Sequence, residues 1–82
     1  MTVISNKELG EVVRFHRKKS GLTQIELASM AGIGKATVFD IEKGKMAVQL
    51  DKLLALFEVL NIKIELKSMV MEEYEKGKNL GP

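Results

Sequence analysis

A short run in the first half of the chain combines hydrogen-bonding and apolar groups along one turn and a half of an expected helix. Lys35 can donate hydrogen bonds to the guanine acceptors of a DNA major groove, and Ala36 and the Thr37 methyl can contact a thymine methyl. Phe39 and Asp40 follow one turn later; the aromatic ring is expected to pack on thymine methyls or on a partner, the alternative being a place in the core. The candidate base-contacting residues are Gly34, Lys35, Ala36, Thr37, Phe39 and Asp40.

A second set of residues can hold the phosphate backbone around such a run. Gln24 begins an expected helix, where an amide beside free backbone N–H groups suits a phosphate oxygen. Thr23 is more simply a helix cap, although it is close enough to contribute. Basic residues cluster at the end of the first expected helix and again after the base-contacting run. The candidate phosphate contacts are Thr23, Gln24, Lys43, Lys45 and Lys19.

Two long charged residues lie near seams that the apolar pattern predicts to be buried. A salt bridge between Arg17 and Glu42, joining the first and third helices, explains both, and we favour it over a DNA role for Arg17. His16 is the only histidine and there is no cysteine, so a metal site is not expected, and His16 is interpreted as a core residue. No acid–base constellation or cofactor motif is present, so neither an enzyme nor a bound cofactor is predicted.

The elements that position these residues are four helices with clear start and stop signals. Ser5 with Glu8, and Thr23 with Glu26, have the spacing of capping boxes. Glycines mark the ends of the first three helices. The predicted helices are residues 5–20, 23 to about 30, 34 to about 43 and about 49–60, the last with a broad apolar face.

After residue 61 the hydrophobic period changes from that of a helix to that of a strand. Ile62, Ile64 and Leu66 alternate with charged residues, which predicts a strand over 62–68 with one apolar face. The chain offers no second strand, so we expect the segment to pair with its copy in an antiparallel ribbon about a twofold axis. The alternative is a fraying extension of the preceding helix. Residues 69–82 have little apolar content and are expected to be disordered.

The totals fit one small domain. The chain has 82 residues, 45% hydrophobic and 29% charged, with a net charge of +2 and no cysteine. Apolar stretches are only a few residues long, so no membrane partner is expected, and no secretory signal is evident. Without cysteine the chain suits a cytoplasmic location, and association with a second copy is the obvious further source of stability. Residues 1–61 are predicted to be a DNA-binding domain, 62–68 a dimerisation strand and 69–82 a tail.

Residues 5–61 resemble the lambda-repressor-like helix-turn-helix family, also called the xenobiotic-response-element type. The resemblance implies a mostly α fold of four to five helices that binds double-stranded DNA. It implies that the position of Gln24 contacts phosphate, that base contacts fall at Gly34, Lys35, Ala36, Phe39 and Asp40, and that Arg17 and Glu42 form the family's salt bridge. The motifs that carry it are Arg17, Gly21-Leu22-Thr23-Gln24, Glu26-Leu27-Ala28, Gly32-Ile33, Thr37-Val38, Ile41-Glu42 and Gly44-Lys45.

The small size, the position of the motif and the run Ile62-Lys63-Ile64-Glu65-Leu66 also resemble the HipB-like antitoxins. That resemblance implies a homodimer whose strands form an intermolecular lid, repression of its own operon at an inverted repeat, and binding of a HipA-type serine/threonine kinase toxin. Two copies would place their recognition helices roughly 34 Å apart, one turn of B-DNA. The alternatives are a stand-alone phage-type or restriction-control repressor, and a protein-interaction module with secondary DNA binding.

Overall fold

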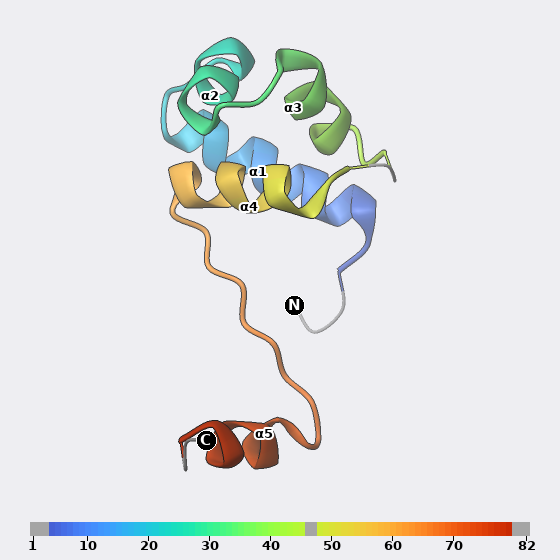
Figure 1. Ribbon diagram of the computed structural model, residues 1–82. Helices are drawn as coiled ribbons and strands as arrows, with labels where there is room; N and C mark the ends of the chain where they lie inside the picture. Colours follow the sequence, from blue (N-terminus) through green and yellow to red (C-terminus); the bar gives the residue numbers. More distant parts are fainter. Residues whose placement is uncertain (1–3, 46–47, 80–82) are drawn as a thin grey trace.

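The computed structural model describes residues 4–45 and 48–79 and shows a helical protein (Figure 1). Four helices pack together, and an extended segment leads from the fourth to a fifth helix that is set apart from this body. The mostly helical fold class is therefore confirmed. The helices are α1 (Asn6–Lys19), α2 (Gln24–Ala31), α3 (Lys35–Glu42), α4 (Leu50–Leu60) and α5 (Met71–Asn79).

Helix ends follow the local signals of the sequence. The Ser5 hydroxyl accepts a hydrogen bond from the Glu8 backbone N–H at 3.2 Å and caps α1. Gly32 ends α2 in the left-handed conformation, with φ 69°, which a residue with a side chain rarely adopts. Asn61 ends α4 in the same conformation, with φ 58°. These ends set the two turns that orient α3 and the extended segment.

The core lies where α1, α2, α3 and α4 meet. Val13, Leu27, Val38 and Leu56 are fully buried there, one from each helix. Helices α1 and α3 approach closely because Gly10 lies directly against the end of α3. The other buried hydrophobic residues are Ala28, Ile41, Leu53, Phe57 and Leu60. This packing holds α3 across α1 and α2 with one side facing solvent.

Residues 62–68 form no strand with any other part of the chain that the structure describes. Ile62 donates its backbone N–H to the Phe57 carbonyl at 2.9 Å, and the segment then runs away from α4 (Figure 1). A strand requires a neighbouring strand for its backbone groups, and the single protomer has none to offer. The predicted pairing of Ile62, Ile64 and Leu66 across a homodimer therefore stays a prediction.

The prediction of a disordered tail is wrong over Met71–Asn79, which forms α5. The segment begins with acidic Glu72 and Glu73 and ends with Lys76 and Lys78, an order that suits the helix dipole. Lys76 and Glu72 also form an i,i+4 ion pair at 3.2 Å. These local interactions favour a helix although the segment has few apolar residues. Residues 80–82 of the predicted tail lie outside the described residues.

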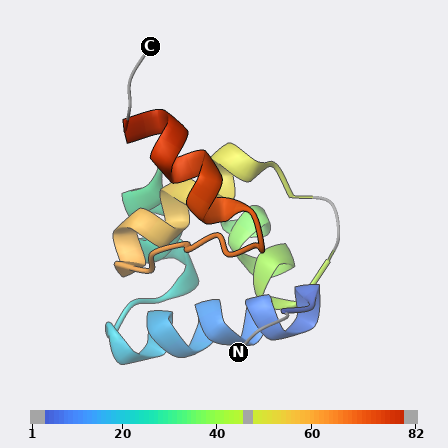
Figure 2. The ribbon, with the colours of Figure 1, turned by 90° about the horizontal axis from the view of Figure 1, so that it is seen from below.

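Helices α3 and α5 lie at opposite ends of the molecule (Figure 1). When the molecule is seen from the α5 end, α5 lies nearest the viewer, and α2 and α3 lie on the far side of the four-helix body (Figure 2). The chain measures 44 × 24 × 24 Å along its principal axes. None of the helices in the described ranges combines the length and apolar character needed to cross a membrane.

Candidate nucleic-acid interface

The first turn of α3 projects from the body. Gly34 precedes it in an extended conformation, and Lys35 and Ala36 are exposed. Val38 and Ile41 point into the core, as their spacing predicts. The remaining predicted base-contacting residues lie on or beside the outer side: Phe39 is exposed, and Thr37 and Asp40 are half-buried. The six candidates thus share one accessible helix, as insertion into a major groove requires.

Phe39 is not a core residue, because 42% of its surface is exposed. The Nζ atom of Lys43 lies 5.5 Å from the centroid of its ring, a cation–π arrangement. The alternative that Phe39 completes the core is therefore wrong. An apolar ring is held on the outside of α3, next to a positive charge.

Asp40 and Lys45 pair with each other at the far end of α3. Lys45 Nζ lies 3.2 Å from an Asp40 carboxylate oxygen, and the side chains are 63% and 41% exposed respectively. Such a pair contributes little to stability, so Lys45 is free to exchange the carboxylate for a phosphate. This arrangement joins a candidate base contact to a candidate phosphate contact.

Arg17, Glu42 and Gln24 form a network beneath the exposed side of α3. The predicted Arg17–Glu42 ion pair is present, with Arg17 Nε 2.6 Å and Nη2 3.0 Å from the two Glu42 oxygens. Arg17 Nη1 also donates to the Leu22 carbonyl at 2.9 Å. Hydrogen bonding to Glu42 raises the pKa of Arg17 further above its ordinary value, so the guanidinium stays charged.

The Gln24 amide is held by the same carboxylate. Gln24 Nε2 donates to Glu42 Oε1 at 3.2 Å, which links the start of α2 to the end of α3. The side chain of Glu42 is only 4% exposed, and its charge is balanced by Arg17. The amide has a second N–H, which a phosphate oxygen could accept. Sequence spacing predicted the ion pair but did not reveal this third member.

Thr23 caps α2, as its position predicts. Its hydroxyl accepts from the Glu26 backbone N–H at 3.1 Å, and its own N–H donates to the Glu26 carboxylate at 2.9 Å. That backbone hydrogen bond is the main reason why the pKa of Glu26 lies below its ordinary value, and a hydrogen bond with the Thr23 side chain lowers it further. The capping box fixes the backbone at the start of α2, where Gln24 is presented.

Arg14 is a basic residue that the sequence-based site did not include. It lines an open hollow of about 260 Å³ together with Gln24, Phe39 and Lys43, between α1, α2 and α3. The basic cluster at the end of the first helix was the available signal, but it did not show which member faces α3. Lys19, the member that was chosen, lies 5.8 Å from the Phe15 centroid and does not line this hollow.

Lys35 lies at the other side of the same face. It lines an open hollow of about 450 Å³ with Thr23, Gln24 and Ile25 at the start of α2. The two hollows share Arg17 and Gln24, so the face is continuous from Lys35 to Lys43. No group of acidic residues and histidine within the described ranges is arranged to hold a metal ion.

The comparisons with known proteins agree with this geometry. A family model described as helix-turn-helix matches residues 13–67. An HTH-type transcriptional regulator of Sinorhizobium fredii, y4mF, is 37% identical over 59 residues, which cover 72% of this chain and 78% of the relative. An HTH-type transcriptional regulator of Methanothermobacter thermautotrophicus is 44% identical over 39 residues, 48% of this chain and 56% of the relative.

Solved structures with the same fold include two kinds of regulator. A chain in the HipA-HipB-O2-O3 complex superposes with a TM-score of 0.74 at 25% identity, covering 84% of this chain and 97% of that chain. The restriction-modification controller protein C.AhdI of Aeromonas hydrophila superposes with a TM-score of 0.66 at 31% identity, covering 71% and 88%. The chain therefore belongs to the lambda-repressor-like helix-turn-helix family of DNA-binding transcriptional regulators.

Proposed function

We propose that this regulator is a sequence-specific repressor that binds an inverted repeat in double-stranded DNA as a homodimer. The observation that carries the proposal is the exposed first turn of α3, with Lys35 and Ala36 in solvent while Val38 and Ile41 anchor the helix in the core. A helix fixed from below and open at its N-terminal turn is the arrangement that places side chains on base edges.

In the proposed complex the base contacts come from Lys35, Ala36, Thr37, Phe39 and Asp40, with Gly34 allowing close approach of the backbone. Lys35 donates to guanine, Asp40 accepts from cytosine, and the Phe39 ring packs on thymine methyls. The phosphate contacts come from Gln24, Lys43 and Lys45 of the predicted set and from Arg14, which lines the same face. Lys19 and the Thr23 hydroxyl are less well placed, because one lies beside Phe15 and the other caps α2.

Dimerisation is proposed through residues 62–68. Their backbone groups have no ladder partner within residues 4–45 and 48–79, and the apolar Ile64 and Leu66 are exposed, 51% and 72% respectively. A second copy of the same segment would pair with these backbone groups and cover the exposed apolar side chains. The segment lies at the end of the body opposite α3, so pairing there leaves both recognition helices free.

We further propose that the repressor is the antitoxin of a HipBA-type system that represses its own operon and binds a HipA-type kinase toxin. The similarity to a chain in the HipA-HipB-O2-O3 complex, over 84% of this chain, supports this proposal. The second candidate is a stand-alone controller of the restriction-modification or phage type. The 31% identity to the controller C.AhdI favours that candidate.

DNA binding is tested by selecting duplexes from a random pool and measuring their affinity by fluorescence anisotropy at two salt concentrations. We expect an inverted repeat with half-sites about one helical turn apart, bound with an affinity that falls steeply with salt. Lys78→Ala, on α5 at the far end of the molecule, is the control and should bind like the wild type. Failure to enrich any sequence, or equal affinity for random duplexes, would contradict specific repression.

The toxin partner is tested by co-expression with the product of the adjacent gene. An antitoxin should co-purify with that product in a defined ratio and suppress its toxicity to the host. A stand-alone controller should purify by itself while retaining specific DNA binding. A chain that binds the adjacent product but no specific DNA would instead favour the protein-interaction module.

A further inference from the structure

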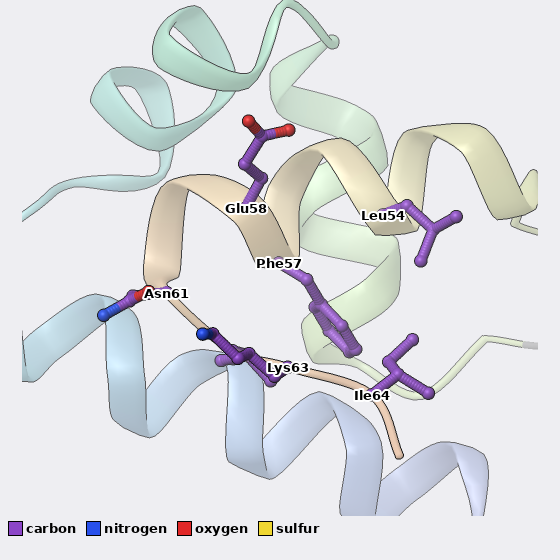
Figure 3. A pocket seen from close by; sticks show the side chains of 7 residues that line it. Leu54, Phe57, Glu58, Asn61, Lys63 and Ile64 are labelled. Atoms are coloured by element: carbon purple, nitrogen blue, oxygen red, sulfur yellow. The ribbon is translucent and has the colours of Figure 1, made fainter. Parts of the chain in front are cut away.

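The extended segment after α4 has two chemically different sides. Ile62 is half-buried against the core, and Ile64 lines a groove of about 270 Å³ with Leu54 and Phe57 of α4 (Figure 3). Lys63 and Glu65 are exposed. Ile62 and Ile64 therefore lie toward α4, Lys63 lies at the edge of the same groove, and both charged side chains remain accessible to a neighbouring strand.

We propose that two copies of this segment pair in one register only, with Ile64 facing its own copy across the twofold axis. This inference rests on the homodimer proposed above and specifies its interface. Ile62 then faces the partner's Leu66, and Lys63 faces the partner's Glu65. The Ile64 contact on the axis occurs once and each of the other two occurs twice by symmetry, so the ribbon contains a continuous apolar face and two pairs of opposite charges.

Charge selects this register over its neighbours. A ribbon centred one residue later, on Glu65, would place that carboxylate opposite its own copy and Lys63 opposite the partner's Lys67. A ribbon centred one residue earlier would place Lys63 opposite its own copy. Like charges directly opposite each other are destabilising, and all three ribbons keep the apolar residues on the same side of the sheet, so the charges decide among them. Of these three ribbons, only the one centred on Ile64 avoids like charges at opposed positions. A ribbon centred on Leu66 would also pair opposite charges, Glu65 with the partner's Lys67, but it would place Ile64 opposite Ser68, so packing excludes it.

Packing favours the same register. With Ile64 at the axis, both copies of its side chain lie beside the grooves formed by Leu54 and Phe57, so one apolar cluster joins the two bodies. Leu54 is 45% exposed in the protomer and Ile64 51%. Burial of these surfaces supplies the association free energy, and packing and charge together select the register.

The absence of cysteine from the chain allows a direct test by single substitutions. A disulfide requires Cα atoms within about 7 Å, which directly opposed residues in a ribbon satisfy. Copies of a residue one place off the axis are roughly 8 Å apart, beyond that limit. Under mild oxidation Ile64→Cys should therefore cross-link at least about tenfold faster than Lys63→Cys or Glu65→Cys.

An independent test exchanges the charges. Lys63→Glu and Glu65→Lys should each weaken the homodimer, because each variant places like charges opposite one another. A mixture of the two variants should form heterodimers well in excess of the statistical proportion, since every charge then meets its opposite. Lys67→Glu is the matched control and should leave the dimer unchanged, because Lys67 faces the uncharged Asn61 of the partner subunit in this register.

The oligomeric state by sedimentation separates the possible failures. A wild-type chain that stays monomeric at micromolar concentrations would overturn the proposed homodimer and, with it, the register. A dimer in which Lys63→Cys or Glu65→Cys cross-links faster than Ile64→Cys would overturn the register alone, as would a dimer that forms no cross-link at any of the three positions. A dimer that cross-links through Ile64→Cys and forms the charge-selected heterodimer is the predicted result.

Discussion

Glu42 is the residue that most strongly links the helices of the candidate interface, because its carboxylate oxygens accept hydrogen bonds from two other helices. It accepts from Arg17 of α1 and from Gln24 of α2 while belonging to α3. Both charged side chains are almost fully buried, 11% and 4% exposed, so neither charge can rely on water. The network therefore stabilises the body and also holds the Gln24 amide, the proposed phosphate contact.

Removing one member of this network should cost far more than removing the charged pair together. Glu42→Ala leaves the Arg17 charge buried and unpaired, and we expect a loss of about 3–5 kcal/mol in the free energy of unfolding. The double variant Arg17→Met with Glu42→Leu should recover most of the lost free energy of unfolding, apart from about 1 kcal/mol for the hydrogen bond to the Leu22 carbonyl. Urea denaturation of Glu42→Ala, Arg17→Met and the double variant measures all three losses. Additive losses in the double variant would contradict a coupled pair.

Substitutions of the two lysines at either end of α3 should change DNA binding in different ways. Lys35→Ala removes a donor to a base edge, so it should reduce discrimination between cognate and mismatched duplexes by about 1–3 kcal/mol. Lys45→Ala removes a phosphate contact, so it should weaken all duplexes equally and lower the salt slope by about 0.9. Anisotropy titrations over a series of salt concentrations measure both. Identical effects of the two substitutions would show that the roles are assigned wrongly.

At the residue scale the sequence predicted what spacing within helices determines. Val38 and Ile41 were placed in the core and Arg17 opposite Glu42, and the structure confirms these positions. The bond from Gln24 to Glu42 and the position of Arg14 beside Phe39 could not be predicted in this way. Both depend on how one helix is rotated about its axis relative to another. The hydrophobic periodicity within a helix does not define that rotation.

At the scale of elements, Gly10 determines how closely α1 and α3 approach. A Cβ atom built there would lie 2.4 Å from the Ile41 carbonyl oxygen and 2.7 Å from that of Glu42. Backbone atoms cannot move aside as a flexible side chain can. The absence of a side chain at Gly10 therefore allows α1 and α3 to cross closely. The position of the glycine within α1 does not by itself indicate this role.

Gly10→Ala should destabilise the body although alanine favours helices. We expect overpacking to cost about 1–3 kcal/mol, more than the helix propensity of roughly 1 kcal/mol that alanine adds. Gly77→Ala in α5 is the control, because a Cβ atom at that position would meet no neighbouring group within 4 Å. This control should not lower the midpoint temperature of thermal unfolding. Thermal unfolding of the two variants compares them. A neutral Gly10→Ala would contradict the close approach of α1 and α3.

The capping box of α2 should make stability depend on pH at the acidic end. The folded state lowers the pKa of Glu26 from 4.5, because the carboxylate accepts from the Thr23 N–H. The stabilisation is therefore complete above the unfolded pKa and lost as pH falls through the lower, folded value. Between about pH 6 and about pH 3 the wild type should lose more stability than Glu26→Gln, whose amide oxygen still accepts. Equal losses would contradict this role.

The elements also show where local signals suffice. Ser5, Thr23 and Gly32 predicted the starts and ends of helices correctly, because caps act on their own backbone. The prediction of disorder is wrong over Met71–Asn79, which forms α5, because the order of charges along this segment favours a helix despite its low apolar content. The segment 62–68 differs again: its alternation indicates a strand, but the partner that would complete it is another molecule.

At the scale of the whole molecule, the proposed recognition helix and the proposed dimerisation segment lie at opposite ends. The exposed turn of α3 lies at one end of a molecule 44 Å long, and the extended segment leads from α4 to α5 at the other end (Figure 1). A dimer formed at one end can therefore present two recognition helices to the same side of a duplex, and substitutions at either end should act independently.

The most direct test of the central claim, that the first turn of α3 reads the major groove, is methylation interference on a selected duplex. Methylation of guanine N7 modifies the major groove, and methylation of adenine N3 modifies the minor groove. We predict that N7 methylation at one or more guanines in each half-site blocks binding, that adenine N3 methylation there does not, and that Lys35→Ala abolishes the interference at one guanine. Binding that is insensitive to N7 methylation, or interference that Lys35→Ala leaves unchanged, would contradict the claim.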